Sequence, residues 1–350
     1  MSTTIEVLAE RVRSAADSKT PLRIRGGGTK DFYGRVTQGE VLDTRGYSGI
    51  VDYEPTELFV TARCGTSLAE LERMLTERNQ MLAFEPPHFG DATVGGAIAT
   101  GLSGPRRATS GAARDFVLGV RIVDGRGRDL RFGGQVMKNV AGYDVSRFLA
   151  GSLGTLALIT EVSLKVLPVP SASATMVLEA SEADAIMMMN RWAGQALPIS
   201  ATCFADGRLH VRLSGAAAAL RAAQPKIGGE TLPDDGIFWQ SVCEQTHAFF
   251  RRAGDLWRLS VPSVTPPLGL GTTLIEWGGA QRWIAGSANG ATIRETVATA
   301  RGHATLFRSS GARESVFTPL TPSLARIHRN LKQEFDPHGI FNPGRMYADL

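Results

Sequence analysis

The stretch Leu22-Arg23-Ile24-Arg25-Gly26-Gly27-Gly28-Thr29 joins a short strand-like segment directly to three glycines and a threonine. Glycine adopts backbone conformations closed to other residues, so a glycine run can point successive N–H groups at one anion. A strand that leads into such a loop is a common setting for phosphate contact. Taken alone, the stretch is equally compatible with a phosphate-binding loop and with a plain glycine turn. The rest of the sequence is needed to distinguish the two.

Two other phosphate-binding motifs are disfavoured by the residues that follow. A P-loop requires G-x-x-x-x-G-K-[ST], whereas Lys30 is followed by Asp31 and has the wrong upstream spacing. A dinucleotide-binding fingerprint opens a helix, whereas residues 31–34 are typical of a loop. An NTPase or an NAD-dependent enzyme is therefore a weak interpretation.

Length and composition restrict the class of protein. A chain of 350 residues exceeds the usual size of one hydrophobic core, which favours two domains. The net charge of +4 is spread along the chain without a polybasic run, which disfavours nucleic-acid binding. No apolar run is long enough to span a membrane, so we expect a cytoplasmic protein whose only membrane association is through a complex.

The three cysteines do not indicate a cluster. Cys64, Cys203 and Cys243 lie far apart and form no C-x-x-C pair. This spacing argues against a zinc site, an iron–sulfur cluster or a disulfide framework.

The N-terminal half predicts a mixture of helices and strands. Residues 1–17 fit an amphipathic helix with Ile5, Leu8, Ala9 and Val12 on one face. A helix is predicted over 67–78 from the capping-box spacing of Ser67 and Glu70, and a hairpin turn over Asp124-Gly125-Arg126-Gly127. Strands are predicted over residues 22–25, 58–63, 116–123, 129–132 and 156–167.

Pro168 and Pro170 interrupt the strand pattern, and we predict a domain boundary there. Beyond it we expect an α+β domain, with a helix from Ser181, a hairpin that turns at Asp206-Gly207 and an alanine-rich helix over 216–223. Met187, Met188 and Met189 in the first of these helices are interpreted as core residues, because methionine fills irregular gaps.

Two further groups of small residues follow the glycine turn. One comprises Phe84-Glu85-Pro86-Pro87, residues 92–101 and Ser110-Gly111; the other comprises residues 138–144, residues 151–156 and Ile159-Thr160-Glu161. Small residues at this density let a flat ligand lie against the backbone. Each group alone is moderate evidence, but their order and spacing together are specific.

These motifs resemble the family of FAD-binding proteins typified by vanillyl-alcohol oxidase and p-cresol methylhydroxylase, and within it the branch of glycolate and D-lactate dehydrogenases. The resemblance covers about residues 5–168 and returns at Phe335 to Arg345, which is similar to the branch's D-P-x-x-x-x-N-P-G-K ending. Arg345 replaces the usual lysine. The resemblance implies an α+β fold, with a PCMH-type FAD-binding domain of two α+β subdomains over 1–168, a smaller α+β cap domain over 169–308, and a C-terminal segment, 309–350, that returns to the FAD-binding domain.

The resemblance also implies the cofactor site. The glycine turn is expected to hold the FAD pyrophosphate, the loop over 151–154 and Ile159 to approach the adenosine half, and Asn342 to lie near the flavin ring. The full set of expected FAD-binding residues is Arg25, Gly26, Gly27, Gly28, Thr29, Pro86, Thr93, Gly95, Gly96, Thr100, Ser110, Gly111, Gly151, Ser152, Gly154, Ile159 and Asn342.

Covalent attachment and a resident metal are both disfavoured. Some members of the family tether the flavin through His or Cys in the first or second loop, but this chain has Thr29-Lys30 and Ala108-Thr109-Ser110 there, so we expect non-covalent FAD. Ala205 to His210 superficially resembles a metal-binding signature of the catalytic subunits, but no partner histidine precedes it closely. The catalytic residues stay unknown, with His210, Arg258 and Arg308 as weak candidates, the two arginines for binding a carboxylate.

A short second domain without a metal set resembles the smaller FAD-binding subunits of bacterial glycolate oxidase complexes. That resemblance implies a larger FAD-binding catalytic subunit and an iron–sulfur subunit as partners, with a small 2-hydroxy acid such as glycolate or D-lactate as substrate. Two alternatives stay open: a self-sufficient FAD-dependent 2-hydroxy-acid dehydrogenase, and a non-catalytic assembly subunit that holds FAD.

Overall fold

The computed structural model describes residues 3–134, 144–286, 289–311 and 315–350, which fall into two compact units. The first unit comprises residues 1–102, 112–168 and 319–350, and the second comprises 103–111 and 169–318. Residues 138–143, which belong to the second of the two groups of small residues, lie outside the described residues. In the part of the chain that is described, no helix is long and apolar enough to cross a membrane.

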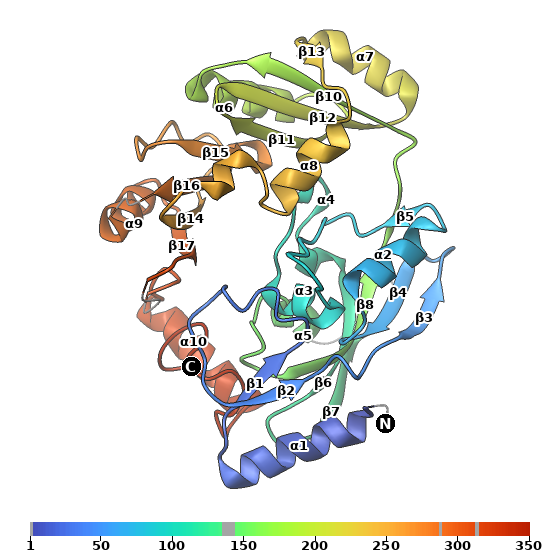
Figure 1. The fold of residues 1–350 in the computed structure, drawn as a ribbon, viewed down its shortest axis with the longest axis vertical. Coiled ribbons are helices and arrows are strands. Elements are labelled where there is room, and N and C mark those ends of the chain that lie inside the picture. The colour runs from blue at the N-terminus through green and yellow to red at the C-terminus, as the bar shows by residue number, and fades with distance from the viewer. Residues whose placement is uncertain (1–2, 135–143, 287–288, 312–314) are drawn as a thin grey trace. The chain divides into compact units, whose positions relative to one another are not determined.

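The first unit contains a five-stranded antiparallel sheet in the order β3-β4-β8-β6-β7 (Figure 1). The strands are β3 (Ile50–Glu54), β4 (Phe59–Arg63), β8 (Leu158–Lys165), β6 (Val117–Val123) and β7 (Asp129–Gly133). One hydrophobic core joins this sheet to α2 (Leu68–Thr76), α3 (Val94–Thr100) and α5 (Val145–Leu149). Small pieces nearby are β5 (Gln80–Met81), β9 (Leu167–Pro168) and the 3-10 helix η1 (Ala113–Phe116).

A second core of the same unit lies around the parallel pair β1 (Leu22–Arg25) and β2 (Glu40–Asp43). The helix α1 (Ile5–Ser18) packs here, and its buried residues include the predicted face of Ile5, Leu8, Ala9 and Val12. The two cores agree with the two α+β subdomains that the family resemblance implies.

The C-terminal segment returns to the first unit. After α10 (Pro322–Phe335), the chain passes beside β1, where Leu22 N–H donates to Ile340 O at 2.7 Å and Asn342 N–H donates to Leu22 O at 2.9 Å. The segment is therefore part of the fold of the unit that carries the glycine turn.

A buried ion pair fixes this return. The Asp336 side chain is completely buried and accepts hydrogen bonds from the Ile340 N–H at 3.1 Å and the Phe341 N–H at 2.8 Å. The Lys332 ammonium donates to Asp336 at 2.7 Å and to the carbonyls of Thr155 and Phe341 at 2.7 and 3.0 Å. Burial lowers the pKa of Lys332, and the neighbouring carboxylate opposes that shift. The pair thus links α10 to the chain that follows it.

Two local predictions differ in outcome. The hairpin turn is confirmed, because Asp124 Oδ1 accepts from the N–H groups of Arg126 and Arg128 and Gly127 has a φ of 73°. The capping box at Ser67 is wrong, since its side chain makes no cap hydrogen bond. The backbone of Ser67 is instead engaged in an antiparallel bridge with Thr93, which positions α3.

The second unit is built on an eight-stranded antiparallel sheet in the order β13-β10-β12-β11-β15-β16-β14-β17. The strands are β10 (Ala172–Glu179), β11 (Ile199–Ala205), β12 (Arg208–Gly215), β13 (Glu230–Thr231), β14 (Asp255–Ser260), β15 (Thr273–Glu276), β16 (Gln281–Gly286) and β17 (His303–Arg308). The helices are α4 (Arg107–Ser110), α6 (Glu182–Ala193), α7 (Ala217–Ile227), α8 (Asp235–Cys243) and α9 (Gly290–Thr299), with 3-10 helices η2 (Ala248–Arg251) and η3 (Trp277–Gly279).

The three methionines of α6 are only partly core residues. Met189 is buried at 2% exposure and Met188 packs against the same cluster, whereas Met187 is 62% exposed. The core prediction is therefore wrong for Met187, because one face of an amphipathic helix has to meet solvent.

The segment 103–111 belongs by its contacts to the second unit, although the sequence analysis placed it in a domain over 1–168. Trp277 Nε1 donates to Gly104 O at 3.0 Å, and Thr109 Oγ1 donates to Ser200 O at 2.9 Å. The Arg107 guanidinium lies 4.4 Å from the centre of the Trp277 ring. Residues 309–318 likewise group with the second unit. The functional division into FAD-binding and cap domains stays a prediction.

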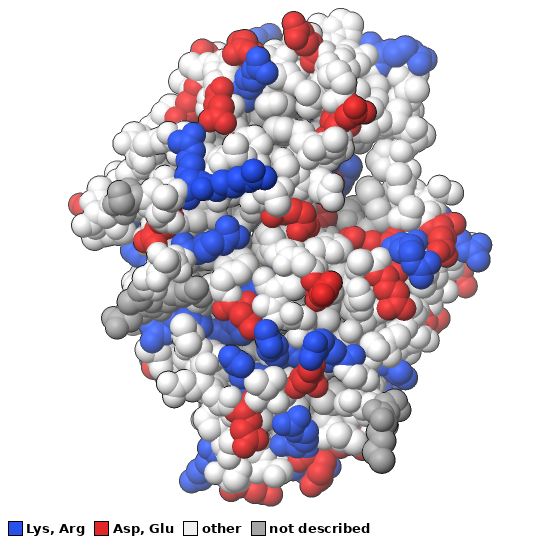
Figure 2. Space-filling model, viewed as in Figure 1, with Lys and Arg blue, Asp and Glu red and all other residues white. Residues whose placement is uncertain are grey.

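Charged side chains of both signs are interspersed on the face drawn in Figure 2. This distribution agrees with the near balance of 38 basic and 34 acidic residues in the sequence.

Candidate cofactor site

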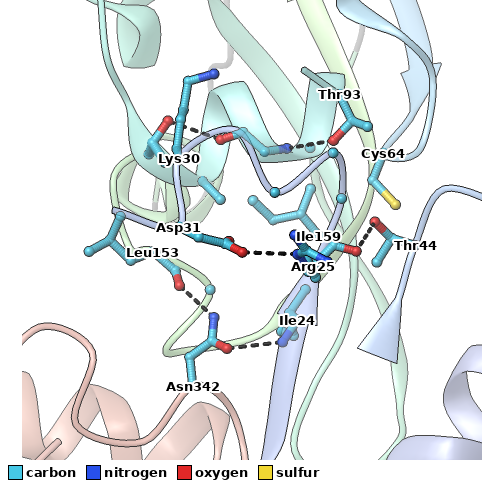
Figure 3. A pocket seen from close by; sticks show the side chains of 18 of the residues that line it. Ile24, Arg25, Lys30, Asp31, Thr44, Cys64, Thr93, Leu153, Ile159 and Asn342 are labelled. Atoms are coloured by element: carbon cyan, nitrogen blue, oxygen red, sulfur yellow. Dashed lines mark hydrogen bonds and ion pairs between the residues drawn. The ribbon is translucent and has the colours of Figure 1, made fainter. Parts of the chain in front are cut away.

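A pocket opens in the first unit where the glycine turn leaves β1 (Figure 3). Its walls come from the glycine turn, α3, β8 and the C-terminal segment. The lining residues are Ile24, Arg25, Gly26, Gly27, Gly28, Thr29, Lys30, Asp31, Thr44, Cys64, Thr93, Gly95, Gly96, Ala99, Thr100, Leu153, Gly154, Ala157, Ile159, Asn342 and Arg345.

The glycine turn is packed too closely for side chains. A Cβ on Gly27 would overlap the backbone carbonyl of Asp91, and a Cβ on Gly26 would overlap the hydroxyl of Thr93. Gly28 has a φ of 72°, in the left-handed region that disfavours other residues. Gly26 and Gly27 are therefore required by the contact between this turn and the chain that leads into α3, and Gly28 by its backbone conformation.

The helix α3 forms the opposite wall of the pocket. Thr93 caps it, and its Oγ1 accepts from the Gly96 N–H at 3.3 Å. Thr100 donates its hydroxyl back to Gly96 O at 2.9 Å, so that hydroxyl is engaged within the helix. A Cβ on Gly95 would lie 2.6 Å from the Cβ of Cys64, so glycine is needed for α3 to approach the residue that directly follows β4.

Asn342 holds two walls of the pocket together. Its side chain is 1% exposed; Oδ1 accepts from the Ile24 N–H at 2.9 Å, and Nδ2 donates to Leu153 O at 2.7 Å (Figure 3). Both ends of the amide are thus engaged with the backbone. Asn342 acts here as a positioning residue that ties β1 to the loop before β8.

Cations outnumber anions in the pocket lining. Arg25, Lys30 and Arg345 are cationic and Asp31 is the one carboxylate, so the lining carries a net charge of +2. Arg25 Nε pairs with Asp31 at 2.9 Å. Lys30 is buried and donates to His88 O at 3.1 Å and to Thr29 Oγ1 at 3.3 Å. A partly desolvated site with excess positive charge favours an anionic ligand.

Two buried polar atoms beside this pocket have no hydrogen-bond partner among the described residues: Arg345 Nε and Ser152 Oγ. Buried polar groups in native proteins are nearly always satisfied, so Arg345 Nε, which belongs to the pocket lining, is a candidate donor for a ligand. The charge, the glycine turn and this donor fit a ligand that carries a pyrophosphate, such as FAD.

The structure brings together most of the predicted cofactor residues. Those that line the pocket are Arg25, Gly26, Gly27, Gly28, Thr29, Thr93, Gly95, Gly96, Thr100, Gly154, Ile159 and Asn342. Pro86, Gly151 and Ser152 belong to the same unit but are not among the lining residues, and Ser110 and Gly111 belong to the second unit.

Sequence reasoning missed several lining residues. Lys30 and Asp31 directly follow the glycine turn, and that adjacency is a signal that could have found them. Thr44 and Cys64 are brought in by tertiary structure: Thr44 N–H donates to Arg25 O at 3.0 Å, and Cys64 N–H donates to Thr160 O at 2.7 Å. Ile24, Ala157 and Arg345 complete the missed set, whereas Ala99 and Leu153 lie within the segments 92–101 and 151–154 that the sequence already indicated.

The weak catalytic candidates lie in the second unit. His210 in β12 is 8% exposed and stacks on the Phe238 ring at 3.9 Å between centres. Burial lowers the pKa of His210 to about 4, which keeps the imidazole neutral at physiological pH. Among the described residues no three His, Cys, Asp or Glu side chains gather as a metal site. The structure favours the interpretation of His210 as a packed strand histidine.

Both candidate arginines lie on strands, as expected. The Arg258 guanidinium in β14 lies 5.5 Å from the centre of the Phe307 ring, and Arg308 in β17 donates to Gln245 Oε1 at 2.9 Å. Burial lowers the pKa of Arg308. Their binding of a carboxylate stays a prediction.

Residues 2–133 match the family model described as FAD binding domain. Glycolate oxidase subunit GlcE of Escherichia coli (strain K12) is 49% identical over 347 residues, which cover 99% of this chain and 98% of that protein. The chain belongs to the GlcE family of FAD-binding proteins. The predicted family, and FAD as its cofactor, are thereby confirmed.

Other relatives of lower identity match only part of the chain. Glycolate oxidase subunit GlcD of Bacillus subtilis is 30% identical over 49% of this chain and 37% of that protein. D-lactate dehydrogenase of Archaeoglobus fulgidus is 34% identical over 47% of this chain and 37% of that protein. A solved alkyldihydroxyacetonephosphate synthase matches with a TM-score of 0.70 and 15% identity, covering 97% of this chain and 75% of that one, and this confirms the PCMH-type fold alone.

Proposed function

We propose that this chain holds FAD non-covalently as a subunit of a complex that oxidises glycolate, with D-lactate as a second substrate, to the 2-oxo acid. The observation that carries the proposal is the extent of the match to GlcE, since it includes both units and not the FAD-binding part alone. The shorter matches to GlcD and to D-lactate dehydrogenase support the same class of substrate.

The pocket supports binding of FAD at the sequence-predicted residues. The N–H groups of residues 26–29 would hold the pyrophosphate, whose negative charge the net charge of +2 in the lining would offset. Ile159 would approach the adenosine half, and Asn342 would keep the wall beside the flavin ring in place. When bound, FAD supplies the acceptor for the hydride of the hydroxy acid.

The character of the lining supports non-covalent attachment. No histidine is among the described residues that line the pocket, and Cys64 is its one cysteine. Burial raises the pKa of the Cys64 thiol to about 12. Because the thiolate is the nucleophilic form, a thiol with this pKa is unreactive at neutral pH.

The partners we propose are a larger FAD-binding catalytic subunit and an iron–sulfur subunit, and the proposed location of the chain is cytoplasmic, with any membrane association made through the complex. Electrons from a reduced flavin need an acceptor, and the three separate cysteines of this chain, two of them buried, do not suit cluster ligation. Arg258 and Arg308 stay candidates for binding the substrate carboxylate.

Anaerobic mixing with glycolate tests the division of labour. We expect the flavin of the isolated chain to bleach slowly or not at all, and the flavin of the complex co-purified with both partners to be reduced rapidly. Rapid bleaching of the isolated chain would show a self-sufficient dehydrogenase. A complex that assembles and turns over with an FAD-free pocket variant would show that the chain has only an assembly role.

A further inference from the structure

Arg345 reaches the cofactor pocket from the C-terminal segment, three residues after Asn342. Its side chain is 8% exposed, and Nη2 donates to the carbonyls of Lys30 at 3.2 Å and Tyr33 at 3.4 Å. These bonds hold the guanidinium against the chain that follows the glycine turn. The group is thus placed by the backbone and is fixed before any ligand binds.

The buried Arg345 guanidinium has few partners for its charge and its donors. Nε has no hydrogen-bond partner among the described residues, although the atom is buried. Burial lowers the pKa of Arg345, and Asp31 opposes that shift only through a longer-range attraction. A buried cation that retains an unused donor is destabilising unless an acceptor arrives.

The other polar groups of the lining are engaged with the chain itself. Arg25 pairs with Asp31, Asn342 uses both ends of its amide, and Thr100 donates within α3. Of the buried side-chain nitrogen and oxygen atoms in the described lining, Arg345 Nε is the one without a hydrogen-bond partner, which suits it to receive a ligand.

We propose that Arg345 contacts FAD directly, with Nε donating to an oxygen of the cofactor and the guanidinium charge offsetting its negative charge. The inference rests on the binding of FAD in this pocket. Arginine suits the task because its planar fork offers donors in several directions at once, so Nη2 can keep the backbone bonds while Nε serves the ligand. The point charge of a lysine cannot reproduce both at fixed geometry.

The competing interpretation is purely structural, because Arg345 also joins the C-terminal segment to the loop after the glycine turn. Arg35 N–H donates to Arg345 O at 2.8 Å, and a Cβ on Gly34 would lie 3.2 Å from Arg345 Cγ. A structural role predicts that loss of the guanidinium lowers the stability of the FAD-free and FAD-bound protein equally. A direct contact predicts an additional loss of FAD affinity.

The test uses the full chain with three substitutions: Arg345→Met, Arg345→Lys and, as a control, Arg329→Met. Arg329 is an arginine of the same C-terminal region that pairs at the surface with Asp349 at 3.1 Å. FAD affinity is measured by quenching of flavin fluorescence, and stability by thermal unfolding with and without FAD. The affinities of the parent and the variants for ADP and for riboflavin are also compared, because they show which half of FAD the guanidinium contacts.

We expect Arg345→Met to weaken FAD binding by about 10- to 100-fold, as for loss of a charge-assisted hydrogen bond. Arg345→Lys should recover part of that loss, and Arg329→Met should bind FAD like the parent. The proposal is overturned if Arg345→Met keeps parental affinity while only its thermal stability falls. If Arg345→Met does not fold, parental affinity in Arg345→Lys overturns it equally. A parent chain that binds no FAD would instead refute FAD binding itself.

Discussion

Replacing Gly27 by alanine is expected to weaken FAD binding by about 10- to 100-fold. Overpacking costs about 1–3 kcal/mol, and each loss of about 1.4 kcal/mol from binding lowers the affinity tenfold. The added methyl group would overlap the backbone carbonyl of Asp91, so the turn and the chain before α3 must separate. Backbone atoms cannot swing aside as a flexible side chain would. The N–H groups that face the pyrophosphate should therefore lose their common direction.

The matched control for this substitution is Gly236→Ala. Gly236 lies in α8 of the second unit, and a Cβ there would meet nothing within 4 Å. Flavin absorbance after purification and titration with FAD compare the two variants, with circular dichroism as a check of folding. A Gly27→Ala protein that keeps stoichiometric FAD would show that the turn does not form the cofactor site.

Replacing Asp336 by alanine is expected to lower the free energy of unfolding by about 3–5 kcal/mol, the usual effect of removing one partner of a buried ion pair. The change would leave the Lys332 ammonium, whose side chain is 12% exposed, without its carboxylate. It would also remove the acceptor for two N–H groups of the C-terminal segment. Because this segment carries Asn342 and Arg345, FAD affinity should fall as well.

Urea unfolding measures this loss, and Asp349→Ala is the control. Asp349 makes an exposed ion pair with Arg329, and exposed pairs contribute only about 0–1 kcal/mol. Equal stability of the Asp336→Ala and Asp349→Ala proteins would contradict the role assigned to the buried pair. Unchanged FAD affinity in Asp336→Ala would show that the C-terminal return does not shape the pocket.

Local sequence was enough to predict two helices and five strands of the first unit, namely α1, α2, β1, β4, β6, β7 and β8. The amphipathic period of α1 and the Asp124–Gly127 turn depend on residues that are adjacent or one helical turn apart, so pattern alone reveals them. The capping box at Ser67 did not form, and the Leu68 N–H at the start of α2 instead donates to Ala92 O, which is distant in sequence. Local rules are overridden where another part of the chain approaches.

The candidate site shows the same division. The glycine turn, α3 and Asn342 belong to motifs of the family, so the resemblance was enough to predict them. Thr44 and Cys64 reach the pocket only through tertiary packing, and nothing in their own sequence surroundings indicates it. Arg345 was recognised as a departure from the family's lysine, but its contribution to the pocket depends on contacts with Lys30 and Tyr33 that lie more than three hundred residues away in sequence.

The central claim is that one FAD is held in this pocket without a covalent bond, and acid precipitation of the purified chain tests it most directly. We predict that the purified chain has a flavin spectrum and carries about one FAD, as expected for a single binding site. After precipitation, all of the flavin should be found in the supernatant as intact FAD. Flavin fluorescence that stays with the denatured protein, or a purified chain that takes up no FAD, would contradict this account.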